Sequence, residues 1–317
     1  MRLIAAFFRL VRWPNLVFIV LTQYLFECCI YLRIYPSENT ADRFSILNSQ
    51  WRFTALVIAS VLIAAAGYII NDYFDQNIDE INKPEKMVVN RIIKRRWVIF
   101  WHLLLSMAGL FITMLALPMQ GFWHLVLANM SAIIALWFYS TNLKKQLLVG
   151  NILISLLTAW VIFILFFSKY PLHISELFQL EHHKVRFFRL TILYASFAFI
   201  ISLIREVVKD MEDIEGDRKY GCTTLPIVWG IRTAKVFVAV WVVVLIALLI
   251  ILQIYALGLG WWHSALYCVL FIIAPLMVVL KKLFKASTPI DYHRISTIIK
   301  LVMFTGILSM IFFRLYN

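Results

Sequence analysis

Nine apolar runs, each close to the length of a membrane-spanning helix, follow one another along this 317-residue chain. A helix needs about 20 mainly apolar residues to cross a bilayer. The expected spans are 15–32, 52–74, 97–117, 121–139, 147–168, 187–208, 229–256, 259–280 and 297–315. Only 15% of the residues are charged and 62% are hydrophobic, whereas about a quarter of a soluble protein is charged. The sequence therefore predicts an all-α polytopic membrane protein with its spans in one bundle, and excludes a soluble enzyme.

The segments between the runs contain no Gly/Ser linker, so we expect residues 1–317 to form a single transmembrane domain. The first run follows three arginines, as the apolar part of a signal peptide would. It ends without a small-x-small cleavage site, which favours a retained helix. The four cysteines show no CxxC spacing. Neither a zinc knuckle nor a disulfide framework is indicated.

The basic residues predict the orientation of the chain. With the N-terminus in the cytoplasm, 22 of the 30 Lys and Arg residues fall in cytoplasmic segments, as the positive-inside rule requires. A net charge of +13 could also suggest nucleic acid. In so apolar a chain it fits loops that face anionic lipid. We expect an integral protein of the cell inner membrane that binds no nucleic acid, and nothing indicates an obligate protein partner.

The acidic residues gather in two short windows, each at the cytoplasmic end of an apolar run. Eleven of the 17 Asp and Glu residues lie in 72–85 and 206–217. The spacing i, i+3, i+7 occurs in both windows and places three carboxylates on one stripe of a helix. The two triplets are Asp72, Asp75 and Asp79, and Asp210, Asp213 and Asp217.

Aligned carboxylates repel one another and need a positive partner near a membrane. One interpretation is a solvated helix end, paired with Lys83, Lys86, Lys209, Arg218 and Lys219. Two identical triplets favour a second interpretation, a shared cation. Oxygen ligands without His or Cys select Mg²⁺ or Ca²⁺ over zinc, and Mg²⁺ is commonly held by carboxylates together with substrate phosphates.

An apolar bundle with a metal–diphosphate site at its cytoplasmic mouth suits an isoprenyl diphosphate. The prenyl tail requires an apolar tunnel, and the diphosphate requires metal ions that stabilise its charge as it leaves. The tail then remains as an allylic cation, which a dry cavity protects from water until an acceptor attacks it. The residues alone thus predict prenyl transfer with the active site facing the cytoplasm.

Two motifs carry a resemblance to a known family. Residues 71–79 read NDYFDQNID and match NDxxDxxxD, while residues 209–217 read KDMEDIEGD and match KDxxDxxGD. Weaker agreements are Arg12-Trp13-Pro14-Asn15, Tyr139, Leu143-Lys144 and Gly150-Asn151. At these residues the chain resembles the UbiA superfamily of intramembrane prenyltransferases, which implies a nine-helix enzyme with Mg²⁺ as cofactor.

The resemblance also implies roles for individual residues. It makes all six aspartates catalytic, with Asp72, Asp75, Asp79, Asp213 and Asp217 as Mg²⁺ ligands and Asp210 in support. The implied diphosphate-binding set is Asn71, Lys86, Arg91, Tyr139 and Lys144. Many members carry RPxRP after the first motif, but this chain reads Lys-Pro-Glu-Lys-Met at 83–87. Lysine keeps the charge there without the bidentate fork.

The acceptor is less constrained than the donor. The second motif is most similar to members that geranylgeranylate geranylgeranylglyceryl phosphate, which implies a lipid hydroxyl as acceptor. Aromatic acceptors of the quinone, tocopherol or chlorophyll type are the alternative. A cation-coupled transporter is an alternative of a different class. It would place its carboxylates near mid-span beside Gly or Pro, whereas here they lie at the ends of the runs.

Overall fold

The computed structural model describes residues 2–36, 43–117, 119–170 and 182–316. The chain is 89% helical, and the described residues contain no strand. Nine helices within these residues are long and apolar enough to cross a membrane. They span Trp13–Ile34, Ser49–Phe74, Arg95–Ala116, Gly121–Thr141, Val149–Lys169, His182–Glu212, Gly230–Gly258, Trp262–Lys285 and Pro289–Tyr316. The predicted all-α fold with nine spans is confirmed.

The helices form two compact units. Unit 1 contains Met1–Leu143 and Trp160–Ile192, and unit 2 contains Lys144–Ala159 and Leu193–Asn317. Helices α8 (Val149–Lys169) and α10 (His182–Glu212) contribute residues to both units. The expectation that the whole chain acts as one domain stays a prediction.

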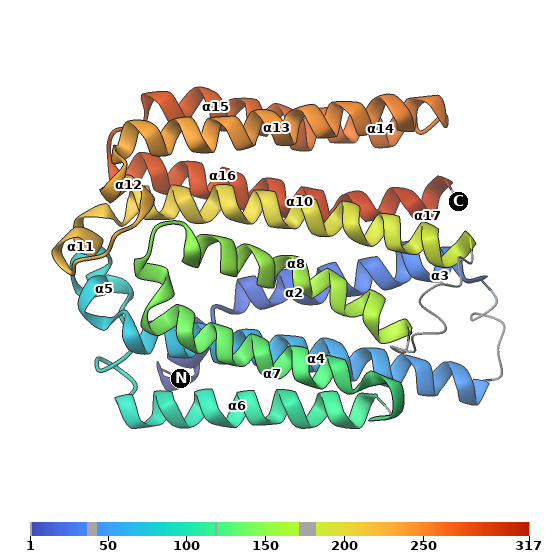
Figure 1. Ribbon diagram of the computed structural model, residues 1–317, viewed down its shortest axis with the longest axis horizontal. Helices are drawn as coiled ribbons and strands as arrows, with labels where there is room; N and C mark the ends of the chain where they lie inside the picture. The colour runs from blue at the N-terminus through green and yellow to red at the C-terminus, as the bar shows by residue number, and fades with distance from the viewer. Residues whose placement is uncertain (1, 37–42, 118, 171–181, 317) are drawn as a thin grey trace. The chain divides into compact units, whose positions relative to one another are not determined.

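Unit 1 is organised around its longest helix, α4 (Arg43–Phe74). Helices α2 (Trp13–Leu25), α6 (Arg95–Ala116) and α7 (Met119–Thr141) pack against it (Figure 1). The first span continues from α2 through a π-helix, η1 (Phe26–Tyr31), into α3 (Leu32–Ile34). Contact between α4 and α6 is so close that a Cβ on Gly109 would lie 2.8 Å from Cγ1 of Ile63. Small residues allow this approach between membrane helices.

A short helix, α1 (Arg2–Leu10), precedes the first span and is not anticipated by the hydrophobic runs. Ala6 and Leu10 of α1 are buried in a cluster with Ile69 of α4 and Val98 of α6. The chain turns from α1 into α2 at Arg12, whose backbone is left-handed at φ 51° and ψ 51°. The packing of α1 thus fixes the position of Arg12 beside α4.

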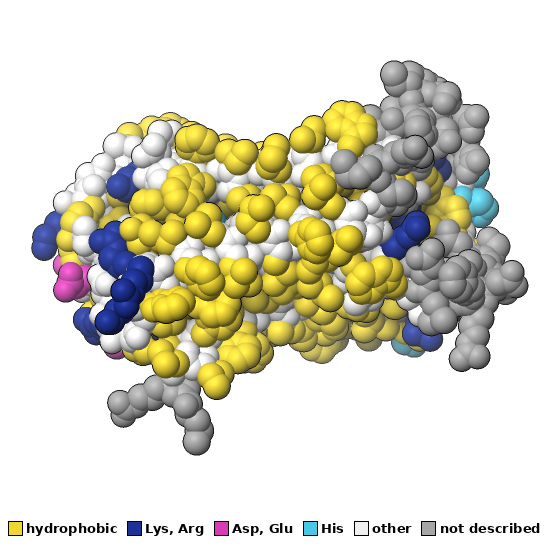
Figure 2. Space-filling view, turned by 90° about the horizontal axis from the view of Figure 1, so that it is seen from below, with side chains coloured by type: hydrophobic (Ala, Val, Ile, Leu, Met, Phe, Trp, Pro, Cys, Tyr) yellow, Lys and Arg dark blue, Asp and Glu magenta, His cyan; other side chains and the backbone are white. Residues whose placement is uncertain are grey.

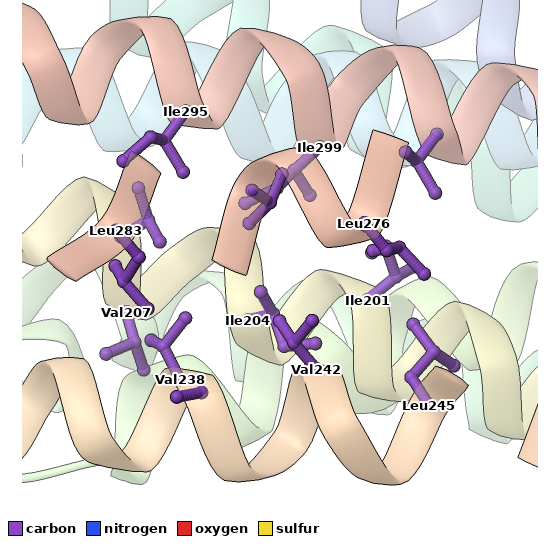
Figure 3. Close-up of a cluster of buried hydrophobic side chains, with 14 of the residues drawn as sticks. Ile201, Ile204, Val207, Val238, Val242, Leu245, Leu276, Leu283, Ile295 and Ile299 are labelled. Carbon is purple, nitrogen blue, oxygen red and sulfur yellow. The ribbon is translucent and has the colours of Figure 1, made fainter. Parts of the chain in front are cut away.

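Unit 2 has a continuous aliphatic core. It is formed by α10, α13 (Gly230–Gly258), α15 (Ala274–Lys285) and α16 (Pro289–Leu308). Within this core Ile204 lies beside Val242, and Leu276 lies beside Ile201 (Figure 3). The eighth span is made of α14 (Trp262–Cys268), a π-helix η5 (Val269–Ile273) and α15, and the ninth ends with η6 (Ser309–Ile311) and α17 (Phe312–Tyr316).

Apolar side chains also cover much of the outer surface. On the face in Figure 2, hydrophobic side chains predominate, and Lys and Arg gather toward its ends. Helix α6 illustrates this pattern, because Phe100, Leu103, Met107 and Phe111 are all exposed. Its polar His102 is buried, with Nδ1 3.0 Å from the Ala66 carbonyl oxygen. Exposed apolar and buried polar groups are what a lipid environment requires.

Candidate active site

The first aspartate motif lies where α4 gives way to a short helix, α5 (Gln76–Asn82), in unit 1 (Figure 1). The helix that the spacing predicts is divided at Asp75, which separates α4 from α5 with φ −85° and ψ −1°. Backbone hydrogen bonds continue across the break, from Asp75 N to Asn71 O at 3.0 Å and from Asp79 N to Asp75 O at 2.8 Å. Asp72 therefore belongs to α4 and Asp79 to α5.

Two polar side chains hold the carboxylates of this motif. Nη2 of Arg12 donates to Oδ1 of Asp72 at 2.6 Å. The Arg12 guanidinium also lies over the ring of Tyr68, one turn earlier on α4, at 5.3 Å. Nδ2 of Asn71 donates to Oδ2 of Asp75 at 2.6 Å. A cation thus neutralises one aspartate, and an amide orients the next.

The ionised form of Asp79 is disfavoured by its surroundings, which raise its pKa. Its own burial, followed by the neighbouring carboxylates of Asp75 and Asp72, raises the pKa of Asp79 to about 7. Both causes disfavour a third negative charge at this position. A divalent cation would remove that penalty, since it compensates several carboxylates at once.

The second motif repeats the local structure of the first in unit 2. Helix α10 ends at Glu212, Asp213 interrupts the helix with φ −96° and ψ 9°, and α11 (Ile214–Lys219) follows. Asp213 N donates to Lys209 O at 2.9 Å, and Asp217 N donates to Asp213 O at 3.2 Å. Aspartate competes with helical backbone bonding through its own side chain, which fits a break at the middle aspartate of both motifs.

A different set of partners surrounds the second motif. Nδ2 of Asn151, near the start of α8, donates to Oδ2 of Asp210 at 2.8 Å. Nζ of Lys209 donates to both Glu206 oxygens, at 2.9 and 3.2 Å, and Arg205 also contacts that carboxylate. The cations beside the motif thus neutralise Glu206. Asp210 is oriented by a neutral amide.

Lys144 lies in a short 3₁₀ turn, η4 (Leu143–Lys145), that is tied to the loop after the second motif. The carbonyl oxygen of Lys145 accepts hydrogen bonds from the backbone N of Thr223 at 2.7 Å and from its Oγ1 at 2.9 Å. Thr223 follows α11 and precedes α12 (Leu225–Val228). Within unit 2, these bonds place the turn that carries Lys144 beside the loop that follows the second motif.

The other predicted diphosphate ligands lie in unit 1. Arg91 is exposed, and its Nη1 donates to the Pro84 carbonyl oxygen at 2.6 Å, so it stabilises the loop after the first motif. Tyr139 is half-buried on the last turn of α7. Lys86 ends a 3₁₀ turn, η3 (Pro84–Lys86), and its side chain lies outside the described part of the structure.

Two neighbours of the aspartates were not among the predicted site residues. Arg12 is 60 residues from Asp72 in the sequence, and Asn151 is 59 residues from Asp210. Each was visible only as part of a weak family-like match. Apart from those matches, the sequence marks Arg12 and Asn151 only as polar residues at the ends of apolar runs.

The aspartates suit a hard divalent cation by their chemistry. The donors are carboxylate oxygens without His or Cys, and burial penalises their accumulated charge at Asp79. Among the described residues, no group of three or more His, Cys, Asp or Glu side chains already converges on one metal position. The type of donor, carboxylate oxygen, therefore fits Mg²⁺, which carboxylates hold together with water and substrate phosphate.

Comparison with known proteins identifies the chain. The model of the UbiA prenyltransferase family matches residues 42–296. Digeranylgeranylglyceryl phosphate synthase from Methanothermobacter thermautotrophicus is 35% identical over 236 residues, covering 73% of each chain. A UbiA homolog from Aeropyrum pernix K1 shares the fold with a TM-score of 0.65 at 14% identity, over 95% of this chain and 98% of that one.

A second solved structure shares the fold at the same level of identity. It is a UbiA homolog from Archaeoglobus fulgidus bound to DMAPP and Mg²⁺, with a TM-score of 0.50 and 14% identity over 96% of this chain and 98% of that one. The family match covers most of the chain and includes both aspartate motifs. The predicted resemblance and enzyme class are confirmed: this protein is a prenyltransferase and belongs to the UbiA family.

Proposed function

We propose that this protein transfers a prenyl group from a prenyl diphosphate to a lipophilic acceptor in the membrane, with Mg²⁺ as cofactor. The observation that carries the proposal is the repeated construction of the two motifs, in which the middle aspartate interrupts a helix and the other two flank it. Mg²⁺ in the Archaeoglobus fulgidus homolog supports the choice of metal. Membership of a prenyltransferase family argues against the alternative of a transporter.

The predicted site residues fall into two groups, metal ligands and diphosphate ligands. We propose that the Mg²⁺ ligands are Asp72, Asp75 and Asp79 of the first motif and Asp213 and Asp217 of the second motif. When bound, the metal would supply Lewis-acid stabilisation of the charge on the leaving diphosphate. The cations and polar groups assigned to the phosphates are Asn71, Lys86, Arg91, Tyr139 and Lys144. We propose that the chain 1–317 acts as one catalytic domain, since a single family match covers both motifs.

The reaction breaks the bond between the allylic carbon and the diphosphate oxygen, and the diphosphate leaves with the electron pair. A new bond then forms between that carbon and the acceptor. An acceptor hydroxyl loses its proton in this step, so a base must lie near the cation. A carboxylate of the second motif and Tyr139 are the two candidates. The apolar lining of the helices would keep water from the cation.

The acceptor we propose is the hydroxyl of a lipid that carries a phosphate, similar to geranylgeranylglyceryl phosphate. The name of the Methanothermobacter thermautotrophicus relative supports this choice. So does the segment 83–96, which holds six Lys and Arg residues after the first motif. A phosphorylated acceptor suits such a segment better than a neutral quinone precursor. An aromatic acceptor is the alternative.

Metal removal tests the core of the proposal. Prenyl transfer should cease when the purified protein is treated with EDTA, and Mg²⁺ should restore it. Zn²⁺ is tested in parallel and should restore less activity, because its preferred tetrahedral shell does not match the octahedral oxygen shell of Mg²⁺ with a bound phosphate. Full activity of thoroughly chelated protein would exclude the metal–diphosphate mechanism.

The choice of acceptor is tested separately, with geranylgeranyl diphosphate as donor. Product should form with geranylgeranylglyceryl phosphate and not with 4-hydroxybenzoate, homogentisate or dihydroxynaphthoate. In the same assay, Lys86→Gln or Arg91→Gln should raise the KM for the acceptor more than the KM for the donor. Arg52→Gln is a matched control, because position 52 lies 20 residues before Asp72 on α4, about 30 Å along the helix. Transfer to the aromatic acceptors alone would overturn the choice of acceptor.

We also propose that the N-terminus and both motifs face the cytoplasm in the cell inner membrane. Single cysteines are introduced at Glu85, Tyr220 and His182 in a chain whose exposed Cys28 is replaced by Ser. Cysteines at 85 and 220 should react with a membrane-impermeant maleimide from the cytoplasmic side only, and one at 182 from the other side. Labelling of 85 and 220 from opposite sides would mean that the motifs do not share a diphosphate.

A further inference from the structure

Arg12 is placed against the first motif by its backbone as well as its side chain. Its left-handed conformation, with φ 51° and ψ 51°, is disfavoured for a residue other than glycine. The turn is closed by hydrogen bonds from Arg12 N to Arg9 O at 3.0 Å and from Asn15 N to Arg12 O at 2.8 Å. Such strain persists only where surrounding packing enforces it.

That packing comes from α1. Ala6, Leu10 and Val11 are at most 4% exposed and share a cluster with Ile69, which precedes Asp72 by one helical turn on α4. The side chain of Arg12 then reaches Asp72 at 2.6 Å, where the two side chains are 36% and 20% exposed. The N-terminal helix, the strained turn and the short ion pair therefore act together to present a guanidinium to the first aspartate.

This placement has a consequence for the order of binding. A divalent cation that approaches Asp72 alone meets a positive charge already bonded to Oδ1 of that carboxylate. A diphosphate changes the balance, because its oxygens accept hydrogen bonds from a guanidinium and bring negative charge of their own. Metal and diphosphate together can therefore replace the ion pair, because the metal binds Asp72 while the diphosphate accepts hydrogen bonds from Arg12. Either ligand alone would leave one of these two charges uncompensated.

We propose that Arg12 is a positioning residue that occupies Asp72 as a built-in counter-cation, so that the first motif binds metal tightly only together with a diphosphate. This inference rests on the proposed function, since it presumes that Asp72 is a metal ligand. It also gives a reason for the strained turn. The turn holds Arg12 on Asp72, so that metal does not bind this carboxylate before the diphosphate is present.

The test measures metal binding rather than turnover. Mn²⁺, detected by electron paramagnetic resonance, is titrated into the full-length protein without diphosphate. Arg12→Gln should bind Mn²⁺ tighter than wild type by about tenfold, the size of an ordinary coupling between sites. Arg12→Lys should stay near wild type because it keeps the charge. Arg95→Gln is the matched control, since Arg95 lies 4.5 Å from the Tyr73 ring beside the motif.

Two further measurements make the result decisive. When the two substitutions are combined, Asp72→Asn should cancel the increase in Mn²⁺ affinity produced by Arg12→Gln, because that increase acts through the Asp72 carboxylate. Wild type should bind Mn²⁺ tighter when geranylgeranyl diphosphate is added, after correction for metal bound by the diphosphate in protein-free solution. Arg12→Met replaces Arg12→Gln if the latter does not fold.

The inference is overturned if the folded charge-removing variant binds Mn²⁺ no tighter than wild type. It is equally overturned if wild type binds Mn²⁺ tightly without diphosphate and gains nothing when diphosphate is added. Failure of wild type to bind Mn²⁺ even with diphosphate is a different outcome, because it contradicts the proposed metal–diphosphate site itself.

Discussion

The two aspartate motifs have the same local structure but different electrostatic partners. In both, a long helix ends, the middle aspartate interrupts it, and a short helix of six or seven residues follows. The first motif meets a cation, since Arg12 contacts Asp72 at 2.6 Å. The first aspartate of the second motif meets an amide instead, since Asn151 donates to Asp210 at 2.8 Å, as Asn71 does to the middle aspartate of the first motif. The same spacing of carboxylates can thus be stabilised by neutralisation or by orientation.

This difference predicts unequal behaviour toward metal. A carboxylate paired with arginine must exchange one cation for another when metal binds, whereas a carboxylate held by asparagine keeps its charge and its orientation throughout. We therefore expect Asp72 to respond to changes of charge and Asp210 to changes of geometry. The following experiments test that contrast.

The largest effect should come from the aspartates themselves. Asp72→Asn and Asp213→Asn should each lower kcat by at least about a hundredfold, because each removes charge that stabilises the leaving diphosphate. Glu80→Gln and Glu215→Gln, which alter exposed acids in the same segments, should retain activity. Size-exclusion profiles in detergent report folding. Loss of folding in both aspartate variants would instead indicate a structural role for the motifs.

The next largest effect should come from Asn151. Asn151→Ala removes the hydrogen bond that orients Asp210 and should lower kcat by about tenfold, as for other residues that support metal ligands. Asn151→Asp should be worse, because it sets a second carboxylate beside Asp210. The affinity for Mn²⁺ without diphosphate should not rise in either variant. If the Mn²⁺ affinity rose as expected for Arg12→Gln, the two motifs would not differ in their response to metal.

The third prediction concerns stability without metal. Because the pKa of Asp79 is about 7 in the folded protein and 3.8 is its ordinary value, the folded state binds more protons than the unfolded state between these limits. Unfolding free energy should therefore fall as pH rises from about 4 to 7, and level off above pH 7. Asp79→Asn should reduce this fall and gain about 1 kcal/mol at pH 8, after allowance for solvent screening.

Thermal unfolding in EDTA at pH 5.5 and pH 8 measures that difference. Added Mg²⁺ with diphosphate should reverse its sign at pH 8, since the aspartate then binds metal and the asparagine does not. Equal stability of the two chains at both pH values would show that Asp79 carries no electrostatic penalty.

The smallest effect should come from Thr223. Thr223→Val removes one exposed hydroxyl bond to Lys145 and keeps the backbone bond at 2.7 Å, so it should change the KM for prenyl diphosphate by less than about threefold. Lys144→Gln, assayed in parallel, should raise that KM more. A large effect of Thr223→Val would mean that the turn at Lys144 depends on the hydroxyl.

The architecture and the chemical class of this protein follow from its amino-acid sequence. Nine apolar runs specify nine helices because a span in lipid is selected by its own length and hydrophobicity. The spacing of six aspartates pointed to a hard cation because charge on one helical face depends only on local geometry. Even here the chain departs from a regular helix, since Asp75 and Asp213 interrupt the stripes that the spacing predicts.

The tertiary structure alone decided which side chains meet those aspartates. Arg12 and Asn151 each reach an aspartate about 60 positions away, and no periodicity in the sequence encodes such a contact. Arg12 reaches Asp72 because α1 packs on α4 and forces a left-handed turn. Asn151 reaches Asp210 because α8 begins beside the end of α10. Contacts of this kind depend on how helices pack, and packing is a property of the whole chain rather than of any one segment.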